Sequence, residues 1–284
     1  MKTMKSKFYS LALAAGMLSL TACSDDNTND SNNDKGNGIE NGSILKGTIT
    51  EDVTLKAGNT YKLSGEYIVE AGATLNIEEG VKIISVYDNI VDYILVKQGA
   101  KINAVGTPDK PIVMTSEKEE PGAWGGIHIC GKAHTNAEGG KGSSEIGGAV
   151  YGGNDDADNS GTLQYIRLEY TGFAFDEEHE ANGISFYGVG NGTIVDHCEA
   201  YKGSDDGFEF FGGSVNVSNM VVVSCSDDSF DWTEGWNGKG TDLVAYQEAK
   251  ATLGYDCDCL IEADNNETVS YTHLRAHETR GNLV

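Results

Sequence analysis

The chain has 284 residues, with 44 Asp and Glu against 20 Lys and Arg, which gives a formal net charge of −24 at pH 7. A surface this acidic repels nucleic acid and anionic lipid, and it favours cations or neutral sugars as partners. The 37 glycines, the 3 prolines and the evenly spread apolar residues predict an all-β chain with many tight turns.

Residues 1–22 begin with three lysines and continue with an apolar run that is too short to span a bilayer. This pattern predicts a signal peptide. Its end, Leu-Thr-Ala followed by Cys23, resembles the bacterial lipobox, in which the cysteine receives a lipid before the chain is cut. The resemblance implies a lipid anchor at Cys23 that holds the protein on a membrane. An ordinary secreted protein that happens to carry a cysteine there is the alternative.

The segment 23–43 is polar and acidic, with almost no apolar residue. Such a segment cannot offset the entropy that is lost on ordering, so we expect a disordered tether. The Ser-Asp-Asp directly after Cys23 resembles the surface-export signal of lipoproteins in some gut-type Gram-negative bacteria. This resemblance implies display on the outer surface of the outer membrane.

A strand and turn pattern repeats along residues 44–268, which we expect to form one domain. The motif Val-x-x-Gly-Ala-x-Leu at 69–75 returns as Val-x-x-Gly-Ala-x-Ile at 96–102. Further along, the interval from Phe186 to Phe208 equals the interval from Phe208 to Phe230, and it is shorter than the interval between the two copies of the motif. Fixed periods in this range indicate a solenoid. We therefore predict a right-handed parallel β-helix with rungs of about 22 to about 27 residues, and the three phenylalanines in one inward ladder.

The stretch Asp156-Ala-Asp158-Asn-Ser160-Gly matches the first half of a calcium-binding loop, including the glycine of its sharp turn. The position that should close such a loop with a glutamate holds Arg167 instead. The sequence therefore predicts a partial calcium loop formed by Asp156, Asp158 and Ser160. A polar loop without a metal is the alternative.

The sequences GSDDGFEFFGG (203–213) and CSDDSFDWTEG (225–235) repeat a turn followed by an aromatic strand. In a solenoid the two turns stack, so that four carboxylates share one corner: Asp205, Asp206, Asp227 and Asp228. Carboxylates this close must be protonated, separated by water or bridged by a cation, and Ca²⁺ accepts six to eight oxygen ligands. Capping of backbone N–H groups by aspartates in a tight turn is the other interpretation.

GAWGGIHICGKAHTN (122–136), YGGNDDADNSGTLQYIRLEYTG (151–172) and the two Ser-Asp-Asp repeats together resemble a family of β-helical surface lipoproteins of Gram-negative bacteria. The resemblance implies a β-helix that is displayed at the cell surface. It brings no established reaction, so no catalytic residue follows from it.

Two classes of function remain open. The first is a non-catalytic binding or adhesion protein for glycans or for envelope or host ligands, with Trp236 as an exposed platform for a sugar ring. The second is a polysaccharide lyase or glycoside hydrolase of the pectin-degrading β-helix type, since aspartates on adjacent rungs could form a catalytic carboxylate pair. Against the second, the cations close in sequence are Lys202 and Lys239, and neither His179 nor His197 has a partner motif.

Residues 269–284, VSYTHLRAHETRGNLV, hold two of the three arginines and two of the six histidines. They resemble the translation of a sequencing-library adapter. We therefore expect that the natural protein continues beyond Thr268 and that the β-helix domain is incomplete at its C-terminal end.

Overall fold

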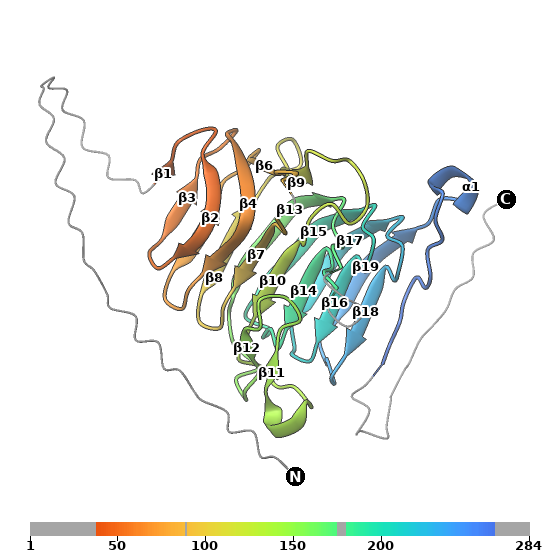
Figure 1. Ribbon diagram of the computed structural model, residues 1–284. Helices are drawn as coiled ribbons and strands as arrows, with labels where there is room; N and C mark the ends of the chain where they lie inside the picture. The colour runs from red at the N-terminus through yellow and green to blue at the C-terminus, as the bar shows by residue number, and fades with distance from the viewer. Residues whose placement is uncertain (1–37, 89, 175–179, 265–284) are drawn as a thin grey trace, which may run out of the picture. The chain divides into compact units, whose positions relative to one another are not determined.

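The structure is a computed structural model that describes residues 38–88, 90–174 and 180–264. Within these residues, 17 strands form one parallel sheet that winds into a β-helix (Figure 1). This arrangement confirms the predicted parallel β-helix. The predicted signal peptide, Cys23, most of the predicted tether and the segment 269–284 lie outside the described residues.

The β-helix has three faces, each made of strands from successive rungs. The first face contains β1 (Gly38–Ile39), β3 (Val53–Leu55), β5 (Thr74–Ile77) and β8 (Lys101–Val105). The second contains β6 (Lys82–Ser85) and β9 (Ile112–Ser116). The third contains β7 (Tyr93–Val96), β10 (Ile127–Cys130), β14 (Ile184–Tyr187), β16 (Phe208–Phe211) and β18 (Phe230–Thr233).

Six longer strands each contribute to two faces. These are β2 (Ile44–Ile49), β4 (Thr60–Val69), β13 (Gly161–Glu169), β15 (Ile194–Tyr201), β17 (Asn216–Val223) and β19 (Gly240–Tyr246). The last four bend between the first and second faces at one residue with a left-handed backbone, namely Tyr165, His197, Asn219 and Asp242, with φ of 51 to 54°. A short helix, α1 (Lys250–Leu253), follows β19. None of the helices in the described part of the chain is long and apolar enough to cross a membrane.

The interior of the β-helix is filled by columns of side chains at matching positions of the rungs. In the third face, one column runs through Ile184, Phe208 and Phe230, and the next runs through Phe186, Phe210 and Trp232. The rings of Phe208 and Phe230 stack with centroids 5.9 Å apart, and those of Phe186 and Phe210 at 5.0 Å. The prediction of a single ladder through Phe186, Phe208 and Phe230 is therefore wrong for Phe186.

The cause of this shift is the length of one connection. Residues 188–193 join β14 to β15, whereas the shorter segment 212–215 joins β16 to β17. The longer connection makes the repeat from Ile184 to Phe208 longer than the repeat from Phe208 to Phe230. Stacked rungs preserve the alternation of inward and outward side chains, so the register follows the connections and not a constant period.

A second apolar layer covers part of the outer side of the third face. The segment 131–160, with the 3₁₀ turn η1 (Glu138–Gly140) and the antiparallel pair β11 (Gly142–Ser143) and β12 (Val150–Tyr151), folds back there. Its Tyr151 ring lies 5.1 Å from that of Tyr187, which in turn stacks on Phe211 at 4.4 Å. Outward residues of β10, β14 and β16 are consequently buried.

Candidate functional site

The turns before β14, β16 and β18 place one side-chain ladder at a corner of the β-helix. Asn182 accepts the backbone N–H of Asp206 at 3.1 Å, Asp206 Oδ1 accepts that of Asp228 at 2.9 Å, and Asp228 Oδ1 accepts that of Cys259 at 2.7 Å. Each rung is thus capped by the side chain of the rung before it. These hydrogen bonds support the capping interpretation for Asp206 and Asp228, and they occupy one carboxylate oxygen of each residue.

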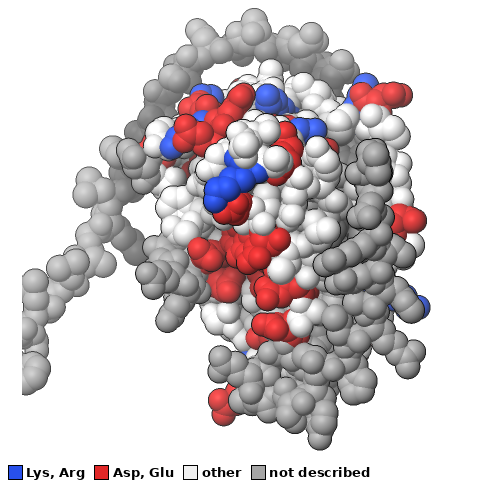
Figure 2. All heavy atoms as spheres, turned by 90° about the vertical axis from the view of Figure 1, so that its right-hand side faces the viewer, with Lys and Arg blue, Asp and Glu red and all other residues white. Residues whose placement is uncertain are grey.

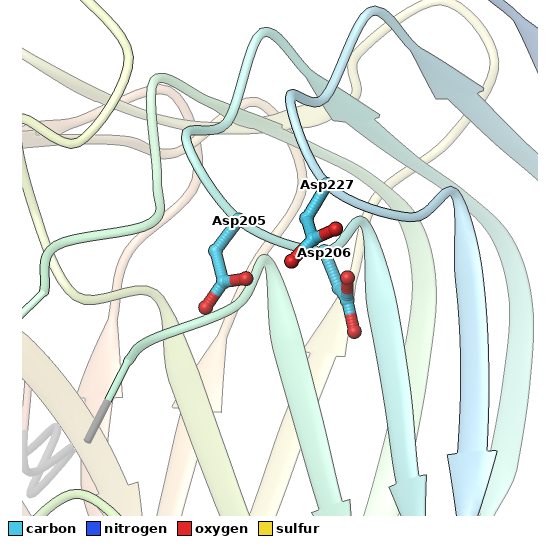
Figure 3. A group of neighbouring side chains, drawn as sticks. All are labelled: Asp205, Asp206 and Asp227. Carbon is cyan, nitrogen blue, oxygen red and sulfur yellow. The ribbon is translucent and has the colours of Figure 1, made fainter. Parts of the chain in front are cut away.

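The same corner brings three of the predicted aspartates together. One oxygen from each of Asp205, Asp206 and Asp227 lies within 4.8 Å of the others. Figure 3 shows these side chains projecting from the turns that precede β16 and β18. Asp205 and Asp206 are both buried. We call this group the first triad.

Two further acidic groups extend along the corner and include residues that the sequence analysis missed. Glu209 of β16 and Asp231 of β18 are paired in register on the outer side of the third face. Glu209 and Asp231 converge with Asp206 in a second triad, and Asp231 converges with Asp228 and Glu262 in a third. The sequences FEF (208–210) and FDW (230–232) already indicated these two outward acids, because an acid between two inward aromatic residues must point outward.

Figure 2 shows the acidic side chains gathered on the side of the molecule that carries β18 and β19. Every member of the three triads is a carboxylate. Within the described ranges, two of the basic residues considered above have other partners: Arg167 pairs with Glu199 at 3.1 Å, and Lys202 with Glu248 at 3.2 Å. His197 lies 2.8 Å from Asp196, whereas His179 is outside the described residues.

Burial and mutual repulsion raise the pKa values of these acids. Burial, followed by the charges of Glu180 and Asp227, raises the pKa of Asp205 from 3.8 to about 8. Burial and the neighbouring Asp205 raise the pKa of Asp206 well above its ordinary value, and burial and Asp206 do the same for Glu209. At neutral pH such groups either keep a proton or require a cation that offsets their charge.

The geometry of the first triad fits a cation that prefers oxygen ligands. Oxygens at 2.3–2.6 Å from a Ca²⁺ ion can be at most about 5 Å apart across it, and the three carboxylate oxygens satisfy that limit. The triads contain neither nitrogen nor sulfur ligands, which are those that Zn²⁺ and Cu²⁺ prefer. The residues present therefore fit Ca²⁺ better than a transition metal.

The residues of the predicted calcium loop at 156–160 make hydrogen bonds to segment 131–160. The carboxylate of Asp156 accepts the backbone N–H of His134 at 3.1 Å and lies 2.7 Å from its ring Nδ1. Asp158 accepts the backbone N–H of Lys132 at 3.1 Å and the Ser160 hydroxyl at 3.4 Å. Asp156 and Asp158 belong to none of the groups of three acidic residues that converge in the described residues. The contacts of this loop anchor segment 131–160, and calcium binding by Asp156, Asp158 and Ser160 stays a prediction.

Trp236, the predicted platform for a sugar ring, is half-buried, and its binding of a ligand stays a prediction. Its indole ring stacks on Phe210 with centroids 4.6 Å apart, and its ring N–H donates to the Val215 carbonyl at 3.1 Å. Trp236 therefore covers the core beside Trp232. One ring face and the indole N–H are already used in packing.

The stacked parallel rungs define a β-helix protein with an acidic corner on the outer side of one face. A family model described as a pectate-lyase-like beta helix domain matches residues 47–280, which is more than half of the chain. The chain therefore belongs to this family of β-helix domains. Searches of curated proteins and of solved structures gave no match.

Proposed function

We propose that this protein is a cell-surface β-helix that binds a glycan through a divalent cation without turning it over. The observation that carries the proposal is the first triad, in which three carboxylate oxygens lie within 4.8 Å of one another. A Ca²⁺ ion held there has coordination positions left, because three protein oxygens supply fewer than the six to eight that it accepts. Sugar hydroxyls or uronate groups can fill these positions.

The charge of the chain narrows the class of ligand. With a net charge of −24, the protein repels an acidic glycan unless a cation lies between them. Uronate-containing glycans are therefore expected to bind only when Ca²⁺ is present. Neutral glycans are expected to depend less on salt, since they carry no charge to be screened.

Lipid anchoring is the second part of the proposal. It is supported by the basic start, the short apolar run and the Leu-Thr-Ala-Cys sequence that ends at Cys23. The acidic segment 23–43 would then hold the β-helix away from the membrane. A protein displayed in this way would act as an adhesion or glycan-capture protein of the outer membrane.

One observation favours the enzyme alternative. Asp205 has its pKa raised to about 8, so it holds a proton at neutral pH, as a general acid of a glycoside hydrolase does. The partner carboxyl groups of such enzymes are about 5 to 9.5 Å apart. In the first triad, however, three carboxylates converge where a catalytic pair needs two, which favours a shared cation over a catalytic pair.

A glycan panel separates these alternatives. The full chain is incubated with polyuronates and neutral glycans, with Ca²⁺ or with EDTA, and both binding and products are measured. Saturable, Ca²⁺-dependent binding without new reducing ends or unsaturated products supports the proposal, and loss of that binding in Asp205→Asn assigns it to the first triad. Products that disappear in Asp206→Asn would instead establish a lyase or hydrolase.

A further inference from the structure

Beside the first triad, the structure holds a buried acidic oxygen that the protein does not satisfy. Asp231 is 8 % exposed, and its Oδ1 atom is buried with no hydrogen-bond partner. Buried polar atoms are almost always paired, so an unpaired carboxylate oxygen calls for a specific explanation. Asp231 is also the residue that the second and third triads share.

The second triad brings one oxygen from each of three carboxylates together. Asn182 holds Glu209 Oε2 by donating to it at 2.6 Å, and Asp206 Oδ1 is held by the N–H of Asp228. Each of these contacts fixes one oxygen of its carboxylate, and Glu209 also shares a side-chain hydrogen bond with Asp231. With Asp231, they offer three oxygens within 4.8 Å of one another. Contacts with other parts of the protein thus orient the carboxylates before any ligand arrives.

We propose that Asp206, Glu209 and Asp231 hold a second divalent cation, which Asp206 bridges to the cation of the first triad. Ca²⁺ is the ion that suits three carboxylates with flexible geometry. The inference builds on the function proposed above, since the second ion would fix the shared Asp206 in position for the ligand-binding one. It can nevertheless be tested without any glycan.

The third triad is explained more simply by a shared proton. A side-chain hydrogen bond with Asp228 is the largest of the causes that raise the pKa of Glu262 to about 7. Glu262 is also exposed, so water can replace a missing ligand there. In the second triad Glu209 and Asp231 likewise share a side-chain hydrogen bond, but the Oδ1 atom of Asp231 is buried and has no partner.

The test is the number of Ca²⁺ ions bound by the full chain at pH 7.5, measured by calorimetry. The wild type is expected to bind at least two ions. Glu209→Gln and Asp205→Asn are each expected to bind one fewer, and Asp206→Asn two fewer. Glu51→Gln, which removes the same charge from an exposed turn, is the control and should match the wild type.

A wild type that binds a single ion, or a Glu209→Gln variant with the wild-type number, would overturn the inference. If Glu209→Gln does not fold, anomalous diffraction from wild-type crystals soaked in Ca²⁺ decides the matter: a peak among Asp206, Glu209 and Asp231 supports the site, and its absence refutes it. If Glu209→Gln loses an ion and the wild type binds no glycan, the proposed function is rejected and the second site stands. If the wild type binds glycan and Glu209→Gln keeps the wild-type number of ions, the second site is rejected and the proposed function stands.

Discussion

The stability of the cation-free protein should fall between pH 5 and pH 8 because of Asp205. This carboxyl is 7 % exposed, and its pKa is raised from 3.8 to about 8. Between these two values the unfolded chain has lost the proton while the folded chain still holds it. The folded state therefore binds more protons, and its stability, which is complete below pH 3.8, is lost as the pH rises toward 8.

The size of this effect follows from the pKa. Each pKa unit corresponds to about 1.4 kcal/mol, so the rise from 3.8 to about 8 amounts to roughly 5 to 6 kcal/mol over the whole range. A typical domain is stable by about 5 to 15 kcal/mol, so the loss is a large fraction of the total. Ca²⁺ should offset it, because a bound cation stabilises the ionised carboxylates.

Urea unfolding at pH 5, 6, 7 and 8, in EDTA and in Ca²⁺, measures the free energy of unfolding directly. In EDTA the wild type should lose about 1.4 kcal/mol for each pH unit from Asp205 alone. Asp205→Asn should be less sensitive to pH by that amount and should gain less from Ca²⁺. The control is Asp109→Asn, an exposed residue that should keep the wild-type slope. A wild type that is equally stable or more stable at pH 8 than at pH 5 in EDTA would refute this reasoning.

Three more predictions concern the core, the corner ladder and the anchor. Phe208→Ala should lower the free energy of unfolding by about 3 to 5 kcal/mol, because it opens a large cavity in the column above Phe230; a loss below about 1 kcal/mol would show that the column is misplaced. Asp228→Asn keeps the oxygen that accepts the backbone N–H of Cys259, so it should change the free energy of unfolding little at pH 5, whereas Asp228→Ala should lower it by about 1 to 3 kcal/mol. Equal effects of the two variants in urea unfolding would argue against the cap. Labelled fatty acid should enter the wild type and be absent from Cys23→Ala, and equal labelling of both would reject the lipid anchor.

Much of the architecture could be predicted from the sequence, because a solenoid repeats its pattern locally. The motif at 69–75 and its copy at 96–102 pair residue by residue, with Val69 beside Val96 and Leu75 beside Ile102. The outward Arg167 beside Glu199 was predictable for the same reason. The residues of one strand and turn unit determine which of its side chains point inward, and stacking repeats that arrangement along the rungs.

The tertiary structure alone decided which acids meet and which residues are used elsewhere. Asp156 and Asp158 matched a metal loop in sequence, and in the structure one oxygen of each accepts a backbone N–H, from His134 and Lys132, which lie far from them along the chain. Glu262 joins Asp228 from a segment that shares no motif with it. Local sequence determines where a side chain points along its own rung. Its partners depend on the lengths of the connections and on the segments that fold back over the rung, and these contacts are not encoded in any one repeat.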